Sequence, residues 1–177
     1  MEELKADRVK LRALEPDDLQ LLYRVENDPG VWEVSGTQAP FSHFVLKQYL
    51  EQAHRDIYEV KQLRLVICLE ADGRPLGFID LYEFDPSHSR AGVGILLFEA
   101  RDRGQGYAYE ALELLCEYAF THLRLHQLYA GITTDNKPSI TLFEKAGFEL
   151  SGKRLDWIQT AQGYKTELFY QKFADVH

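Results

Sequence analysis

The sequence predicts an α/β protein built on one sheet whose first strands are antiparallel. Three observations predict this class: short segments that are apolar or that alternate apolar and polar residues, longer segments with apolar residues three and four apart, and an Asp-Gly turn between two strand-like segments. The predicted order of elements is β-α-α-β-β-β-α-β-α-β-β. The length suits one core, so we expect residues 1–177 to form a single domain.

The first third of the chain is predicted to form one strand and two helices. Residues 8–14 alternate apolar and polar residues and predict the strand. Residues 15–28 predict a short helix with a proline in its first turn, and residues 41–57 predict a second helix. Residues 31–41, between the two helices, look irregular and carry Trp32 and Glu33. The apolar side of the second helix should consist of Phe44, Val45, Tyr49, Leu50 and Ala53.

Three strands should follow. Residues 63–70 and 76–84 are strand-like, and Asp72 and Gly73 between them are typical of a hairpin turn. Residues 91–98 are apolar on both faces, which indicates a central strand. The glycines inside this strand, Gly92 and Gly94, indicate a bulge, a close backbone approach, or room for a neighbouring side chain.

The last part of the chain predicts two helices and three strands. A helix should begin at about Tyr107, since its apolar residues recur at helical spacing: Ala108, Ala111, Leu112, Leu115, Cys116, Ala119, Phe120 and Leu123. Residues 127–134 should form a buried strand, and residues 136–148 should form a helix with Pro138 near its start and Gly147 at its end. The tail should be two strands around a turn near Gly163.

Charge and composition narrow the function classes. The formal net charge is −8, and an acidic surface repels phosphate backbones, so we expect no nucleic-acid partner. The same charge favours a cationic partner such as a polyamine or a basic peptide, although acidity also serves solubility alone. The six histidines do not cluster, and we expect no metal.

The same composition predicts a cytoplasmic location. No apolar run approaches the ~18–20 residues that cross a membrane, and the charged amino terminus lacks the apolar stretch of a secretory signal. Cys68 and Cys116 lie in predicted core segments, which argues against a disulfide framework. We therefore expect no membrane partner.

A glycine-rich turn, residues 101–106, stands directly before the helix that begins at Tyr107. The first amides of a helix lack internal partners and carry partial positive charge, so glycines there let an anion approach closely. The alternative is a tight turn that needs glycine only for its backbone angles. A triphosphate-binding loop would need Lys-Ser/Thr after the second glycine, and a dinucleotide loop would need a third small residue where Tyr109 stands, so neither fits.

The turn matches a third pattern. The run Arg103-Gly104-Gln105-Gly106-Tyr107-Ala108 fits Arg/Gln-x-x-Gly-x-Gly/Ala, and the same spacing reads from Arg101 to Gly106. It resembles the pyrophosphate loop of the GCN5-related N-acetyltransferases (GNAT). Residues 133–148 resemble this family's second signature, and residues 9–19 resemble the branch that contains spermidine acetyltransferases and ribosomal-protein N-terminal acetyltransferases. The resemblance covers about residues 8–173.

The resemblance implies a GNAT fold: a mixed, mostly antiparallel central sheet with diverging parallel strands and helices on both faces. It also implies acetyl-coenzyme A as the cofactor, bound where residues 91–98 and 127–134 diverge. Its pantetheine arm should pair with the backbone of Ile95, Leu96, Leu97 and Phe98. Its pyrophosphate should be held by backbone amides of Arg103, Gly104, Gln105, Gly106, Tyr107 and Ala108.

The chemistry needs an unprotonated amine beside the thioester, an N–H for the oxyanion and a proton for the departing thiolate. Many relatives supply that proton from a tyrosine in the second signature, where this chain has Phe143. Ser139, one turn earlier, is our candidate for the thiol's hydrogen-bond partner, unless it only satisfies a backbone amide. Asn136 should contact the cofactor, cap the helix, or do both. Phe143 stays a candidate contact of the cofactor.

The acceptor pocket has four candidates: Glu33, Asp80, Tyr82 and Glu83. Strand alternation places Asp80 and Tyr82 on one face and Glu83 on the other. Asp80 could bind a cationic amine, and Glu83 is also our candidate to take up the amine's proton. We expect acetyl transfer to a primary amine, a polyamine such as spermidine in the first place. The alternatives are N-terminal acetylation of a ribosomal protein or peptide, and a non-catalytic acyl-coenzyme A sensor, which Phe143 permits. The resemblance allows a homo-oligomer but does not require one.

Overall fold

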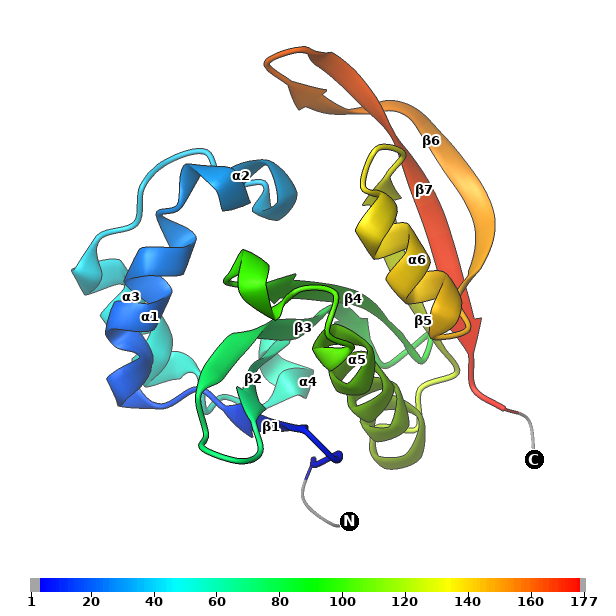
Figure 1. The fold of residues 1–177 in the computed structure, drawn as a ribbon. Helices are drawn as coiled ribbons and strands as arrows, with labels where there is room; N and C mark the ends of the chain where they lie inside the picture. Colours follow the sequence, from blue (N-terminus) through cyan, green and yellow to red (C-terminus); the bar gives the residue numbers. More distant parts are fainter. Residues whose placement is uncertain (1–3, 176–177) are drawn as a thin grey trace.

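A computed structural model describes residues 4–175 of the chain (Figure 1). The strands are β1 (Val9–Ala13), β2 (Leu63–Leu69), β3 (Pro75–Asp85), β4 (Arg90–Leu97), β5 (Gln127–Thr133), β6 (Glu149–Thr160) and β7 (Gly163–Phe173). The α-helices are α1 (Leu19–Glu26), α2 (Pro29–Ser35), α3 (His43–Gln52), α4 (Ile57–Val60), α5 (Tyr107–Glu117) and α6 (Lys137–Lys145). Two 3-10 turns, η1 (Pro16–Asp18) and η2 (Ala100–Asp102), precede α1 and the glycine turn, and η3 (Tyr118–His122) continues α5 as a π-helix.

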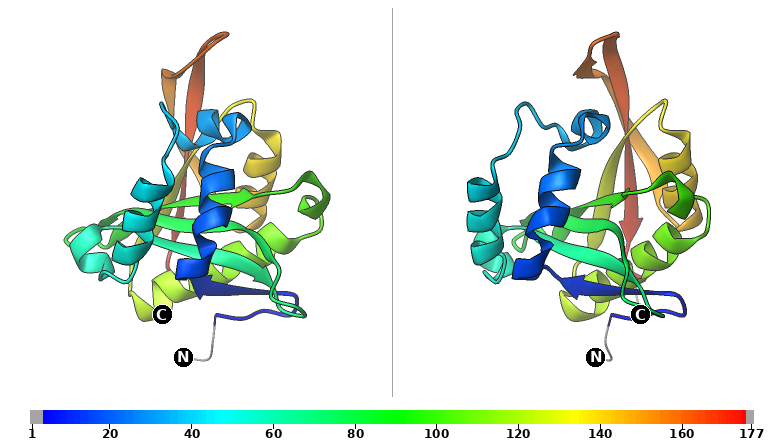
Figure 2. Two further views of the ribbon diagram at one scale, coloured as in Figure 1. Left: turned by 90° about the vertical axis from the view of Figure 1, so that its left-hand side faces the viewer. Right: turned by 60° about the vertical axis from the view of Figure 1, so that its left-hand side comes forward.

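The strands form one sheet in the order β1-β2-β3-β4-β5-β7-β6. Neighbours are antiparallel except β4 and β5, which are parallel. This confirms the predicted mixed, mostly antiparallel sheet. The β6–β7 hairpin extends well beyond the rest of the sheet (Figures 1 and 2).

Helices cover both faces of the sheet, and strand alternation assigns the side chains to each face. On one face, Ile79 and Leu81 of β3 pack into a core shared with α5 and α6. On the other face, Phe78 of β3 packs into a smaller core under α1 and α3. Asp80 and Tyr82 follow Phe78 at two-residue steps, so they point toward the side of α1 and α2.

The segment predicted to be irregular contains a helix, α2. Its start is fixed by Asp28, whose side chain accepts a hydrogen bond from the Gly30 amide at 2.8 Å, and by the proline at its first position. It ends at Gly36, whose φ of 72° is left-handed. None of its residues is buried, so the segment has no apolar periodicity that could reveal it.

The predicted second helix, residues 41–57, is too long, and its buried side differs from the predicted one. The helix is α3, which is capped by the Ser42 side chain and ends at Gln52, and a separate short helix, α4, begins at Ile57. Phe44 is 69% exposed and Val45 is 46% exposed, whereas Leu46 is only 4% exposed. The helix therefore faces the core through Leu46, with Tyr49 and Leu50 packed beside it.

This arrangement makes a paired prediction about stability. Leu46→Ala should lower the free energy of unfolding by about 2–5 kcal/mol, because it leaves a cavity beneath α3. Phe44→Ala, two residues away, should change it by no more than about 0.5 kcal/mol, because the ring is in solvent. Urea denaturation of both variants tests this. Equal losses, or a larger loss for Phe44→Ala, would show that the helix is rotated.

Candidate functional site

The site begins where β4 and β5 separate. The two strands pair over three residue pairs only, of which Gly92 and Tyr129 are the last. Beyond that pair the strands diverge and a cleft of about 540 Å³ lies beside them. It is lined by the central residues of both strands, by the start of α6, and by side chains from α1, α2 and the β6–β7 hairpin.

The separation leaves part of the edge of β4 without a strand partner. The Phe98 amide donates to Leu76 O at 2.9 Å, so Phe98 faces β3. Because antiparallel pairs alternate, Leu96 also faces β3, while Ile95 and Leu97 face the opening. The Leu97 carbonyl accepts a hydrogen bond from Arg103 at 3.1 Å. Among the four residues predicted to pair with a ligand, Phe98 already uses its amide to bond Leu76. Ile95 directs both its N–H and its C=O into the opening, where a ligand could pair with them.

The glycine turn has the conformation that an anion site requires. Gly104 and Gly106 have φ values of 71° and 87°, which glycine adopts without strain. Within residues 4–175, the amides of Gly104, Gln105 and Gly106 donate no hydrogen bond. The first amides of α5 add unpaired donors at the same place. The Arg103 amide is an exception to the predicted set, because it donates to Ala100 O at 3.1 Å.

Arg8, just before β1, holds this turn from outside. Its Nη1 donates to Gln105 O at 2.8 Å, and its Nε donates to Glu110 at 2.6 Å. A Cβ built on Gly106 would lie 2.8 Å from Arg8 Nη2, so the guanidinium fills the space beside the glycine. The sequence motif gives no sign of this residue, which lies 97 positions before Gln105.

A second arginine fixes the turn that precedes the glycines. Asp102 in η2 is buried, and both its oxygens accept from the Arg74 guanidinium at 2.9 Å. The hydrogen bonds from Arg74 lower the pKa of the Asp102 carboxyl. Arg74 lies in the β2–β3 turn, so this bidentate pair joins the hairpin to the start of the glycine turn. Sequence reasoning treated Arg74 only as part of a turn.

The start of α6 brings together the predicted residues of the second signature. Asn136 Oδ1 accepts from the Ser139 amide at 3.3 Å, so Asn136 does cap the helix. Both residues line the cleft. In the part of the chain that the structure describes, the Ser139 hydroxyl has no hydrogen-bond partner. Phe143 is buried against Phe148 with ring centroids 5.0 Å apart, and it also reaches the cleft wall.

The predicted acceptor residues lie together on the side of α1 and α2. Asp80, Tyr82, Glu83 and Glu33 all line the cleft. The prediction that Glu83 faces the other side of the strand is wrong, because β3 is irregular between Tyr82 and Asp85 and Glu83 has a left-handed φ of 47°. This irregularity turns the Glu83 side chain to the same cleft as Tyr82.

Most carboxylates of the cleft have cationic partners. Asp80 accepts two hydrogen bonds from Arg64, at 2.8 and 2.9 Å, and Arg64 also pairs with Glu26. Glu167 pairs with Arg154 at 3.1 Å. Five carboxylates and two guanidinium groups line the cleft, so an excess of negative charge remains there: Glu26, Glu33, Asp80, Glu83 and Glu167 against Arg64 and Arg154.

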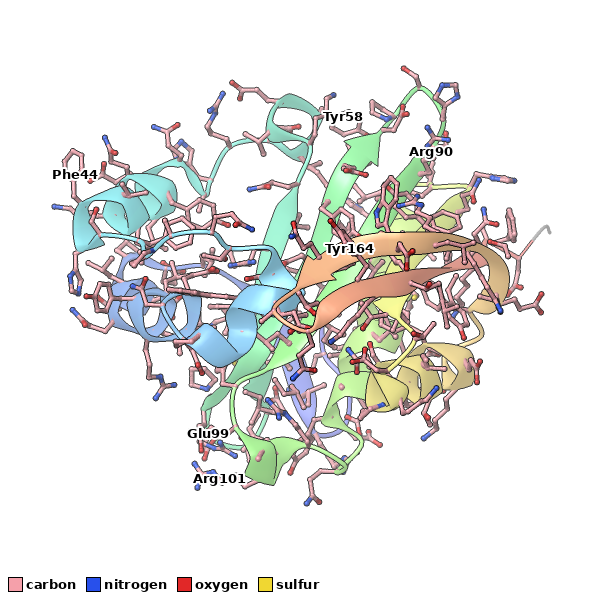
Figure 3. The ribbon with its side chains drawn as sticks, turned by 90° about the horizontal axis from the view of Figure 1, so that it is seen from above. Phe44, Tyr58, Arg90, Glu99, Arg101 and Tyr164 are labelled. Carbon is pink, nitrogen blue, oxygen red and sulfur yellow. The ribbon has the colours of Figure 1, made fainter. Side chains whose placement is uncertain are left out.

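Glu33 is held by a lysine from the hairpin. Lys165 on β7 pairs with Glu33 of α2 and, at 2.8 Å, with Asp135 after β5. Seen from above, the hairpin tip, marked by Tyr164, reaches over to α2 (Figure 3). The Lys165 pairs therefore join the two walls of the cleft at its outer end.

Glu83 is the exception among these carboxylates. No ion pair of Glu83 occurs among residues 4–175, and its carboxylate accepts a hydrogen bond from the Tyr129 hydroxyl at 2.8 Å. The neighbouring Tyr82 is mostly buried, and this burial raises its pKa to about 12. Sequence reasoning missed Tyr129, which looked like an ordinary residue of a buried strand.

The structure also explains one of the two strand glycines. A Cβ on Gly92 would lie 2.3 Å from the Tyr82 ring, which crosses over it from β3. Gly92 therefore makes room for a neighbouring side chain. At Gly94 the nearest atoms would be 3.9 and 4.0 Å away, an ordinary contact distance.

Among residues 4–175, no three histidine, cysteine, aspartate or glutamate side chains are placed to hold a metal ion. None of the helices in this range has the length and apolar character needed to cross a membrane.

Comparison with known proteins gives consistent matches. Residues 8–149 match the family described as acetyltransferase (GNAT) domain. Spermidine N(1)-acetyltransferase of Escherichia coli K12 is 32% identical over 148 residues, which cover 84% of this chain and 76% of that protein. The uncharacterized N-acetyltransferase p20 of Bacillus licheniformis is 28% identical over 96% of this chain and 94% of its own.

A solved structure shares the fold. The spermidine N-acetyltransferase of Vibrio cholerae, crystallised with CoA and spermine, superposes with a TM-score of 0.83. The sequence identity is 22%, and the match covers 93% of this chain and 95% of the other.

The two strand glycines provide a test of the cleft wall. Gly92→Ala should lower the free energy of unfolding by about 1–3 kcal/mol, because the new methyl group displaces the Tyr82 ring. Gly94→Ala, on the same strand and facing the same side, should change it by no more than about 0.5 kcal/mol. Urea denaturation measures both. If Gly92→Ala is as stable as the wild type, Tyr82 does not lie over Gly92.

Proposed function

Because the chain belongs to the GNAT acetyltransferase family, we propose that it transfers the acetyl group of acetyl-coenzyme A to a primary amine of a small polycation such as spermidine. One observation carries the choice of acceptor: the cleft beside the diverging strands has five carboxylates and only two guanidinium groups. Such an excess of one charge, set in a hollow, concentrates ligands of the opposite charge. The spermidine N(1)-acetyltransferase of E. coli, at 32% identity, supports the same choice.

The residues present fit the cofactor. The unpaired amides from Gly104 to Ala108 suit a diphosphate, and the free edge at Ile95 suits an extended arm that pairs like a strand. Arg8 and Arg74 keep the turn in place from outside. When bound, acetyl-coenzyme A supplies an activated acetyl group. The remaining work of binding and moving protons belongs to side chains and amides of this chain.

We assign the proton-transfer roles as follows. Glu83 takes a proton from the acceptor's ammonium, since an ammonium has no lone pair with which to attack. Its carboxylate suits this task because it has no ion pair among residues 4–175. Amides on the open edge of β4 face the place where negative charge develops on the acyl oxygen. Ser139, whose hydroxyl is free and lies at the cleft, donates to the departing sulfur in place of the tyrosine that Phe143 replaces.

The two alternatives make different demands on the site. N-terminal acetylation needs room for a polypeptide, whereas Lys165 ties the two walls of the cleft together at its outer end. A sensor needs no base, whereas Glu83 is kept free of cations beside the vertex of the strands. Both features support an enzyme for small amines.

An acceptor panel tests the proposed function. We expect kcat/KM for spermidine to exceed that for a single-charged amine or a basic peptide by about tenfold or more, and to fall as salt is added. Thiol release from acetyl-coenzyme A measures turnover with spermidine, spermine, an aminoglycoside and peptides. A preference for peptides would support the N-terminal alternative. If the protein binds acetyl-coenzyme A tightly but no amine causes thiol release, the result would support the non-catalytic sensor.

The glycine turn makes a separate prediction about the cofactor. Gly106→Asp should weaken binding of CoA about tenfold or more, because it puts a side chain and a negative charge at the anion site; a loss of about 1.4 kcal/mol already gives that factor. Gly163→Asp is the matched control, since Gly163 also has a positive φ, 118°, and lies in open space at the turn between β6 and β7. Calorimetric titration with CoA measures both. Unchanged affinity in Gly106→Asp would contradict the assignment of this turn.

A further inference from the structure

We infer that Tyr129 is a positioning residue of this site, whose hydroxyl directs the Glu83 carboxylate to the acceptor's ammonium. The inference rests on the proposed function, in which Glu83 takes up the proton. It adds a residue that neither the glycine turn nor the second signature contains. Three features of the structure support it: the lack of other restraints on Glu83, the fixed position of the Tyr129 ring, and its place in the sheet.

The Glu83 side chain has little else to hold it. Its backbone leaves the regular strand with a left-handed φ of 47°, and its carboxylate is exposed. Every other carboxylate that lines the cleft pairs with an arginine or a lysine. Within the described chain, the hydrogen bond from Tyr129 at 2.8 Å is the one hydrogen bond or ion pair of the Glu83 carboxylate.

The Tyr129 ring, in contrast, is fixed on two sides. It stacks on Phe169 of β7 with centroids 5.4 Å apart, and Tyr82 of β3 meets it edge to face at 6.1 Å. Since these two rings come from different strands of one sheet, the hydroxyl has a defined direction. A fixed donor bonded to an exposed carboxylate restricts that carboxylate to fewer rotamers.

Tyr129 also stands at the point that matters for the reaction. It forms the last pair of β4 and β5 with Gly92, so its neighbours on the chain already line the opening. The Glu83 carboxylate is thereby fixed at the vertex of the diverging strands. An amine that reaches the vertex from the side of α1 and α2 meets Glu83 there.

The hydroxyl serves as a donor and does not itself take the proton. Burial and the nearby Glu83 and Tyr82 raise the pKa of Tyr129, and Arg90 opposes this only in part. The phenol therefore stays protonated at neutral pH and keeps its hydrogen bond to Glu83. The proton moves from R–NH₃⁺ to the carboxylate, which gives R–NH₂ and the carboxylic acid of Glu83. The exposed carboxyl then returns that proton to water.

A double-mutant cycle tests the inference. Glu83→Gln should lower kcat for spermidine about 100-fold, which lies within the range of general-base effects. Tyr129→Phe should lower kcat about tenfold, a smaller loss because the base itself remains. If Tyr129 acts through Glu83, adding Tyr129→Phe to Glu83→Gln should lower kcat no further. KM for acetyl-coenzyme A should stay within about twofold throughout, as no cofactor contact is removed. Tyr164→Phe, at the exposed hairpin tip, is the matched tyrosine control and should keep wild-type kcat.

A titration of the tyrosines tests the hydrogen bond between Tyr129 and Glu83 without an activity measurement. In Glu83→Gln, Tyr129 and Tyr82 should ionise at lower pH than in the wild type, because the Glu83 carboxylate raises the pKa of both. Adding Tyr129→Phe should remove most of this difference, since only Tyr129 is hydrogen-bonded to Glu83.

The outcomes separate this inference from the proposed function. If the wild type acetylates spermidine but Tyr129→Phe keeps full kcat, or if the two losses multiply in the double variant, the positioning role is overturned and the proposed function stands. If the wild type acetylates no amine, the proposed function is wrong, and so is the positioning role that rests on it. An unchanged tyrosine titration in Glu83→Gln would also overturn it.

Discussion

The site depends on one feature of the sheet, the parallel pairing of β4 and β5 that stops after three residue pairs. A full ladder would satisfy the edge of β4 and seal the sheet. Because the ladder stops, N–H and C=O groups of β4 remain without a strand partner, and a gap forms between β4 and β5. The turn before α5 lies beyond the end of β4, and the acidic cleft lies toward α1 and α2, so the opening lies between the unpaired amides and the carboxylates. In the proposed function, a cofactor and an acceptor of opposite charge meet there.

The proposed anion site stays open only if the turn is restrained by contacts that do not use its amides. Arg8 holds the turn through the Gln105 carbonyl, and Arg74 holds it through the buried Asp102 carboxylate. Both contacts engage acceptors and leave the donors of Gly104 to Gly106 free. A turn fixed through its own N–H groups would have no donors left for a ligand. The arginines thus supply the rigidity that two glycines would otherwise remove.

Features that depend on residues close together in the chain could be predicted from the sequence. The strands, the glycine turn and the Asn136 cap depend on residues close together in the chain, and each is found where expected. Strand alternation predicts the wrong face for Glu83, because alternation cannot predict the irregularity of β3 after Tyr82. The partners that complete the site lie far apart in the sequence: Tyr129 is 46 positions from Glu83, and Lys165 is 132 from Glu33. Only the sheet order brings them together.

The pairing of charges in the cleft bears on how an acceptor would lie in it. A carboxylate already bonded to a guanidinium attracts a second cation weakly, because most of its field is compensated at short range. Glu167 is of this kind. Glu26 and Asp80 share the single guanidinium of Arg64, so these three groups keep one net negative charge, which favours a cation without fixing its position. Glu83 is uncompensated and stands at the vertex. A polyamine would then place one terminal ammonium at Glu83 and extend its other charges along the paired carboxylates. That order puts the amine that loses its proton next to the opening between β4 and β5.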